Sequence, residues 1–124
     1  LQDIINSEGV ESFLKKEEKY LLALEGENIV IATGGSAVLS EKAMMHLKKN
    51  AVVIYLKVDC HTIVKRIKNS KTRGIAFKEG ETIADIYKIR TPLYEKYADI
   101  TVDCHRRRFS DIVCEISEMI ENGV

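Results

Sequence analysis

Apolar residues recur at helical spacing near both ends of this chain, and each series predicts an amphipathic helix. In residues 1–24 the helical positions are held by Leu1, Ile4, Ile5, Val10, Phe13, Leu14, Leu21, Leu22 and Leu24. Gly9 interrupts this series, so we expect a short helix followed by a longer one. Near the other end the series comprises Ile112, Val113, Ile116, Met119 and Ile120. Ser110 precedes that series and is expected to cap its helix.

Three short apolar runs without polar alternation predict buried strands. They are residues 28–32, Ala51–Val58 and Ile100–Val102. The second run is the clearest, because it is rich in β-branched residues. Runs of this kind, separated by helices, are typical of a parallel sheet that helices cover on both faces. We therefore expect one α/β domain spanning residues 1–124.

Helix-start signals lie between these runs. Ser40 can cap a helix over residues 41–49, and Asp59 can cap the helix that follows the second strand. Thr82 and Asp85 resemble a capping box at the start of a further helix. Residues 69–81, between the last two of these helices, are polar and contain two glycines, which predicts a mobile loop.

Pro92 is the only proline of the chain, and it falls inside the helix that starts at Thr82. A proline there loses a hydrogen bond and clashes with the preceding turn, which costs ~3 kcal/mol or more. Such a costly local feature is often tied to a functional site. Arg90, two residues earlier, is therefore a candidate ligand-binding cation.

Ligands of open parallel sheets bind at the carboxyl ends of the strands. That rule selects Thr33–Ser36, the start of the helix after Asp59, and Asp103–Arg108. The glycines of the first segment would let backbone N–H groups approach a ligand closely, although an ordinary tight turn would also use them. Arginines near this edge of the sheet would bind phosphate, unless they are only solvated surface charges: Arg66, Arg73, Arg90, Arg106 and Arg107.

Composition narrows the class of protein. The 124 residues are 45% hydrophobic, and 19 basic side chains balance 19 acidic ones, so no globally basic nucleic-acid surface is indicated. Three cysteines without a C-x-x-C pair favour reduced thiols in a cytoplasmic protein. No apolar run approaches the ~20 residues of a membrane span. The histidines lack metal-site spacing, and the charged run 15–19 is interpreted as a solvated helix face.

With these residues in view, the chain resembles the shikimate kinases, small P-loop kinases related in fold to the nucleoside monophosphate kinases. The resemblance rests on the strand and glycine turn at 31–35, on Arg66 seven residues before Arg73, and on Arg90-x-Pro-Leu-Tyr94. It continues through the segment from Ala98 to Arg107 and covers nearly the whole chain.

The resemblance implies a three-layer α/β/α fold and the ATP- and Mg²⁺-dependent phosphorylation of shikimate to shikimate 3-phosphate, a step of aromatic amino-acid biosynthesis. It implies that Gly34, Gly35, Ser36 and Arg90 bind the acceptor, with Arg90 holding its carboxylate. A second set would serve the nucleotide: Arg66 and Arg107 at adenine, and Arg73 at the transferred phosphate. The loop 69–81 would be the lid. We expect a monomer.

Several family features are absent from the sequence. The chain contains neither G-x-x-x-x-G-K-[ST] nor the D-x-D segment that helps position magnesium, so we expect both upstream of Leu1 and expect the 124 residues alone to be inactive. Leu14 stands where the family has a substrate-binding arginine, and Ser36 replaces the third glycine of the turn. Two alternatives follow: a kinase of another small hydroxylated acceptor, or a non-catalytic kinase-like module.

Overall fold

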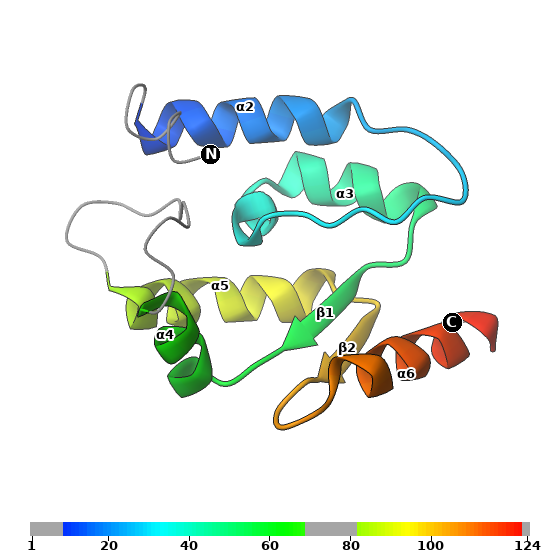
Figure 1. The fold of residues 1–124 in the computed structure, drawn as a ribbon. Coiled ribbons are helices and arrows are strands. Elements are labelled where there is room, and N and C mark those ends of the chain that lie inside the picture. Colours follow the sequence, from blue (N-terminus) through cyan, green and yellow to red (C-terminus); the bar gives the residue numbers. More distant parts are fainter. Residues whose placement is uncertain (1–8, 69–81, 123–124) are drawn as a thin grey trace.

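The computed structural model describes residues 9–68 and 82–122, and within them five α-helices, one 3-10 helix and two strands alternate (Figure 1). In chain order they are α2 (Val10–Leu22), η1 (Gly35–Leu39), α3 (Glu41–Asn50), β1 (Ile54–Lys57), α4 (Cys60–Lys68), α5 (Ile83–Tyr97), β2 (Ile100–Asp103) and α6 (Phe109–Glu121).

The two strands pair in parallel, as the sequence predicts. Their register runs from Ile54 opposite Ile100 to Lys57 opposite Asp103. The carboxylate of Asp99 accepts a hydrogen bond from Val53 N–H at 2.8 Å, so the register is already fixed just before the strands begin. β1 covers only the middle of the predicted run 51–58.

The strand predicted over residues 28–32 is wrong. This segment has no strand partner among the described residues, and the side chains of Ile29 and Val30 are 53% and 99% exposed. A strand is held by hydrogen bonds to a neighbouring strand, so an apolar run without such a neighbour stays irregular. The covered sheet is likewise incomplete in the described part of the chain, where Leu56 of β1 is exposed.

The buried core lies where α2, η1, α3 and the end of α5 meet. Figure 1 shows α2 and α3 side by side, with η1 packed between these helices and α5. The core cluster consists of Leu21, Ala37, Val38, Ala43, Met44 and Tyr97. Because η1 supplies two of these residues, the burial of apolar surface also fixes the glycine turn that precedes it.

Most of the predicted helix starts are confirmed. The Ser40 hydroxyl accepts from Ala43 N–H at 3.1 Å, and Asp59 accepts from Thr62 N–H at 3.0 Å. Thr82 and Asp85 form a reciprocal capping box. The cap expected at Ser110 is wrong: α6 begins one residue earlier, at Phe109, and no side chain caps it.

Gly9 and Pro92, the two residues that the sequence marks as interrupting helices, both occupy special positions in the structure. Gly9 precedes α2 with φ of 86°, in the left-handed region that favours glycine. Pro92 lies inside α5, which continues to Tyr97 and is followed three residues later by β2.

Candidate functional site

The glycine turn is tied to α5 by Tyr94. The Tyr94 hydroxyl donates a hydrogen bond to the carbonyl of Gly35 at 2.8 Å. A Cβ on Gly35 would lie 2.8 Å from Tyr94 Oη and 3.5 Å from Arg90 Nη1. Residue 35 does not have a positive φ. The close approach of Tyr94 from α5 therefore favours glycine at this position.

Arg90 is buried beside this contact, with only 7% of its surface exposed. Burial raises the pKa of Tyr94, whereas the charge and a hydrogen bond of Arg90 lower that pKa, and the charge of Glu17 raises it. The ring of Tyr94 also packs 5.2 Å from the ring of Tyr55, centroid to centroid. These contacts place a guanidinium group and a carboxylate around one phenol at the glycine turn.

Glu17 of α2 approaches the same turn from the other side. Its Oε1 accepts a hydrogen bond of 2.6 Å from the hydroxyl of Ser36, which is buried. Its Oε2 lies 3.3 Å from the position that a Cβ on Gly34 would take. The expectation of a solvated helix face over 15–19 is therefore wrong for Glu17.

A signal for Glu17 was present in the helical spacing. Phe13 and Leu21 are buried on α2, and Glu17 lies four residues from each of them, on the same face. The neighbouring Glu18 is also bonded, to the hydroxyl of Ser40 at the start of α3. A charged run thus supplies two carboxylates that join α2 to the next elements.

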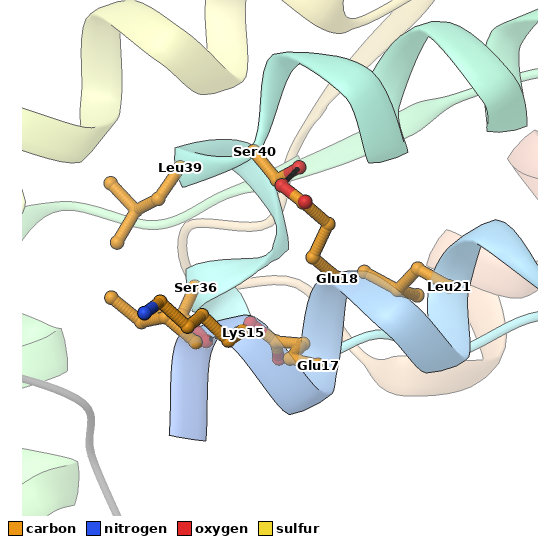
Figure 2. Close-up of a pocket in the computed structure, with 8 residues that line it drawn as sticks. Lys15, Glu17, Glu18, Leu21, Ser36, Leu39 and Ser40 are labelled. Carbon is orange, nitrogen blue, oxygen red and sulfur yellow. Dashed lines mark hydrogen bonds between the residues drawn. The ribbon is translucent and has the colours of Figure 1, made fainter. Parts of the chain in front are cut away.

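A pocket of about 140 Å³ lies between α2 and η1 (Figure 2). Its wall includes Leu14, Lys15, Glu17, Ser36 and Leu39. The pocket adjoins the glycine turn on the α2 side, while Arg90 and Tyr94 contact the turn from α5. Leu14 therefore presents an apolar side chain close to the expected acceptor site.

The carboxyl ends of the two strands form a second candidate site. His105, after β2, contacts Asp59, after β1, through Nδ1 and Oδ1 at 3.0 Å. Hydrogen bonds from Thr62, with a smaller contribution from His105, lower the pKa of Asp59 to about 2. This contact joins the loops after β1 and β2 at the edge of the sheet where ligands of open parallel sheets bind.

Arg66 and Arg107 both act electrostatically on Cys104, which follows β2. Burial raises the pKa of Cys104, whereas the charges of Arg107 and Arg66 lower that pKa. Arg107 Nη1 donates to the carbonyl of Asp103 at 3.2 Å, and its guanidinium forms an ion pair with Glu115. The positive φ of 53° at Arg106 turns the chain just before Arg107.

Comparison with known proteins identifies the family. The family model described as shikimate kinase matches residues 1–121. The chain belongs to the shikimate kinase family. The shikimate kinase of Pasteurella multocida is 33% identical over 123 residues, which are 96% of this chain and 70% of that protein. The shikimate kinase of Haemophilus influenzae (strain PittEE) is 34% identical, over 96% of this chain and 68% of the enzyme.

A solved structure and a much longer protein also match this chain. The structure of shikimate kinase from Acinetobacter baumannii in complex with shikimate superposes with a TM-score of 0.82 at 27% identity, covering 98% of this chain and 70% of that one. Threonine synthase-like 1 from Pongo abelii is 35% identical over all of this chain, which corresponds to 16% of that protein.

Membership of the shikimate kinase family confirms the predicted α/β P-loop kinase fold and supports the phosphotransferase class. The structure groups the predicted site residues in two sets: Gly34, Gly35, Ser36 and Arg90 at the turn, and Arg66 with Arg107 after the strands. Arg73 and the expected lid at 69–81 lie outside the described residues. Sequence reasoning missed Glu17 and gave Tyr94 no role of its own.

Shikimate kinases imply the use of ATP with a metal ion, and the residues at hand fit only part of that requirement. Arg66 and Arg107 suit an adenine ring, because guanidinium planes stack on aromatic rings. Within residues 9–68 and 82–122, no group of three or more His, Cys, Asp or Glu side chains could hold a metal ion.

None of the helices described in these two ranges combines the length and apolar character of a membrane span.

Proposed function

We propose that the full-length protein transfers the terminal phosphoryl group of ATP to a hydroxyl group of a small carboxylic acid. In the shikimate kinases this reaction converts shikimate to shikimate 3-phosphate. The bond between the γ-phosphorus and the β–γ bridging oxygen breaks, and a bond to the acceptor oxygen forms. The hydroxyl proton is released, which leaves ADP and a phosphate ester as the products. Bound magnesium would supply charge neutralisation on the phosphates.

The observation that carries this proposal is the buried guanidinium of Arg90 beside the glycine turn. Arginine binds a carboxylate through two parallel hydrogen bonds, and burial strengthens these bonds because water no longer competes for them. Arg90 is 7% exposed, and its Nη1 lies 3.5 Å from the position of a Cβ on Gly35. An acceptor carboxylate at the turn could therefore meet both the guanidinium and nearby backbone N–H groups.

On the nucleotide side, Arg66 and Arg107 would hold the adenine ring. Glu115 and the carbonyl of Asp103 fix the orientation of the Arg107 guanidinium at its edge. Such edge contacts leave the planar faces of the group available for stacking. The proposed acceptor and adenine contacts therefore come from different elements.

The test is ADP release by the full-length protein in the presence of ATP, Mg²⁺ and shikimate. Arg90→Ala should raise the KM for a carboxylate-bearing acceptor about tenfold or more, with a smaller effect on kcat, because it removes a charge-assisted contact. Arg108→Ala is the control, since Arg108 is exposed before α6 and its side chain makes no cap. The melting temperature of each variant separates loss of binding from loss of fold. An unchanged acceptor KM in folded Arg90→Ala would refute this role.

A second candidate function is a kinase-like binding module without turnover. It is supported by the match to threonine synthase-like 1, in which the similar region makes up only 16% of a longer protein. Ligand binding by the full-length protein without acceptor-dependent ADP release would favour this module over the kinase.

A further inference from the structure

The loop between β2 and α6 is a short turn that presents Arg107. Cys104 N–H donates to the carbonyl of Lys57 at 2.9 Å, so the parallel ladder continues one residue past the strands. His105 N–H then donates to Asp103 Oδ1 at 2.9 Å. Arg107 N–H returns to the carbonyl of Cys104 at 3.4 Å. The backbone of this loop is therefore tied to the strand end as far as Arg107.

Asp59 joins the same loop to the start of α4. Its Oδ2 accepts from Thr62 N–H at 3.0 Å, and its Oδ1 accepts from the Thr62 hydroxyl at 2.7 Å. Oδ1 also lies 3.0 Å from Nδ1 of His105. Hydrogen bonds from Thr62, and to a smaller extent from His105, lower the pKa of Asp59 to about 2. The carboxylate is therefore ionised at neutral pH and only accepts hydrogen bonds, so Nδ1 of His105 donates to it.

The two joined elements each carry one of the arginines proposed to hold adenine. Arg66 lies seven residues after Asp59, about two turns further along α4. Arg107 lies two residues after His105. The charges of both arginines act on the thiol of Cys104, so both lie within electrostatic reach of the same loop. The contact between Asp59 and His105 thus connects two elements whose arginines are expected to face one ring.

This contact is too exposed to be a major source of stability. The side chains of His105 and Asp59 are 49% and 42% exposed. Contacts between half-exposed charged groups contribute little to the free energy of unfolding, because water competes with them. The same contact can still matter for binding, because a loop that is already ordered loses less conformational freedom when its ligand binds. Loss of the contact should therefore appear in nucleotide affinity rather than in stability.

We propose that Asp59 and His105 are positioning residues for the nucleotide, which neither side chain contacts. Their hydrogen bond holds α4 and the loop after β2 at the separation that lets Arg66 and Arg107 meet one adenine ring. This inference rests on the proposed function for the use of ATP and adds the device that prepares its binding site. Without the contact, the loop has to be ordered when the nucleotide binds, and the affinity falls accordingly.

The test measures nucleotide affinity in the full-length protein. Calorimetry gives the Kd of a non-hydrolysable ATP analogue, and ADP release gives kcat and the KM values for ATP and shikimate. His105→Ala should raise the Kd and the KM for ATP about fivefold, the effect of ordering one long side chain on binding. The KM for shikimate and kcat at saturating ATP should change less than about twofold, because the proposed acceptor contacts lie at the glycine turn.

Two further variants separate the hydrogen bond from the bulk of the side chain. His105→Asn should restore most of the affinity, because its Nδ2 donates from the same number of bonds along the side chain as Nδ1 of histidine. His61→Ala is the matched control, since it removes an exposed histidine from the first turn of α4, and its Kd should equal that of the wild type. The melting temperature of each variant shows whether the fold is kept.

A double-mutant cycle ties the effect to Asp59. Asp59→Asn alone should weaken nucleotide binding, because it removes the charge that His105 meets. In the His105→Ala background the same substitution should change the Kd by less than about twofold, because the contact is already gone. If the two losses multiply instead, His105 acts on the nucleotide without Asp59, and the positioning role is overturned.

The outcomes separate this inference from the proposed function. Nucleotide-specific weakening in His105→Ala that His105→Asn restores supports the positioning role, and this comparison of Kd values does not require turnover. An unchanged Kd in folded His105→Ala overturns the role, while acceptor-dependent ADP release by the same variant still supports the kinase. A lower melting temperature with equal rises in both KM values also overturns it, since that pattern marks a general loss of structure. Absence of nucleotide binding by the wild type overturns both proposals.

Discussion

Replacing Gly35 with alanine should destabilise the protein through one identifiable atom. The new Cβ would lie 2.8 Å from Tyr94 Oη, closer than real Cβ contacts allow. The other neighbours are at ordinary contact distance, with Arg90 Nη1 at 3.5 Å and Tyr94 Cζ at 4.0 Å. The clash therefore belongs to the phenol oxygen, and it should vanish when that oxygen is removed.

The expected free energies follow from these distances. Overpacking at Tyr94 should cost about 1–3 kcal/mol. Alanine offsets about 0.4–1 kcal/mol of this cost, because it restricts the unfolded chain and Gly35 does not need a positive φ. The net loss for Gly35→Ala is therefore about 1–2 kcal/mol. Tyr94→Phe alone should cost about 1 kcal/mol, the net value of its hydrogen bond to the Gly35 carbonyl.

The double variant makes the test decisive. In the Tyr94→Phe background, Gly35→Ala should be neutral or stabilising by up to about 1 kcal/mol, because only ordinary contacts remain. Urea unfolding of the four proteins, with the slope m checked for constancy, gives the coupling free energy. If Gly35→Ala destabilises both backgrounds equally, the reasoning from close approach is refuted.

Three further predictions concern α4 and α5. Thr82→Ala should lower the free energy of unfolding by about 1 kcal/mol, because it removes the hydroxyl that caps α5. Urea unfolding measures this change, and an unchanged unfolding midpoint would contradict the prediction. Pro92→Ala should raise the free energy of unfolding by about 2 kcal/mol, because it restores a hydrogen bond inside α5. It should also raise the KM for the acceptor, because it disturbs Arg90 two residues earlier. A variant less stable than the wild type would contradict the cost assigned to the proline. Asp59 has a folded pKa of about 2, below its ordinary value of 3.8, so its stabilisation is complete above about pH 4 and is lost as the pH falls towards 2. The difference in melting temperature between the wild type and Asp59→Asn should therefore shrink between pH 5 and pH 2.5, and a constant difference would contradict the assignment.

Local signals predicted the local structure well. The caps at Ser40, Asp59 and Thr82 each join a side chain to a backbone N–H three residues later, so the sequence contains both partners. Pro92 likewise marked the helix that carries Arg90. The strand predicted at 28–32 is wrong because it depends on a distant partner: an apolar run forms a strand only when another strand pairs with it.

The sequence by itself determined most helix starts, the caps at Ser40, Asp59 and Thr82 and the signature around Arg90, since these depend on neighbours along the chain. Only the tertiary structure decided that Tyr94 reaches Gly35, 59 residues away, and that Glu17 reaches Ser36, 19 residues away. A charged residue on a helix gives no sign in sequence of which distant hydroxyl it will meet. Packing of α2, η1 and α5 around one core brings these groups together, and that packing places opposite charges around the glycine turn.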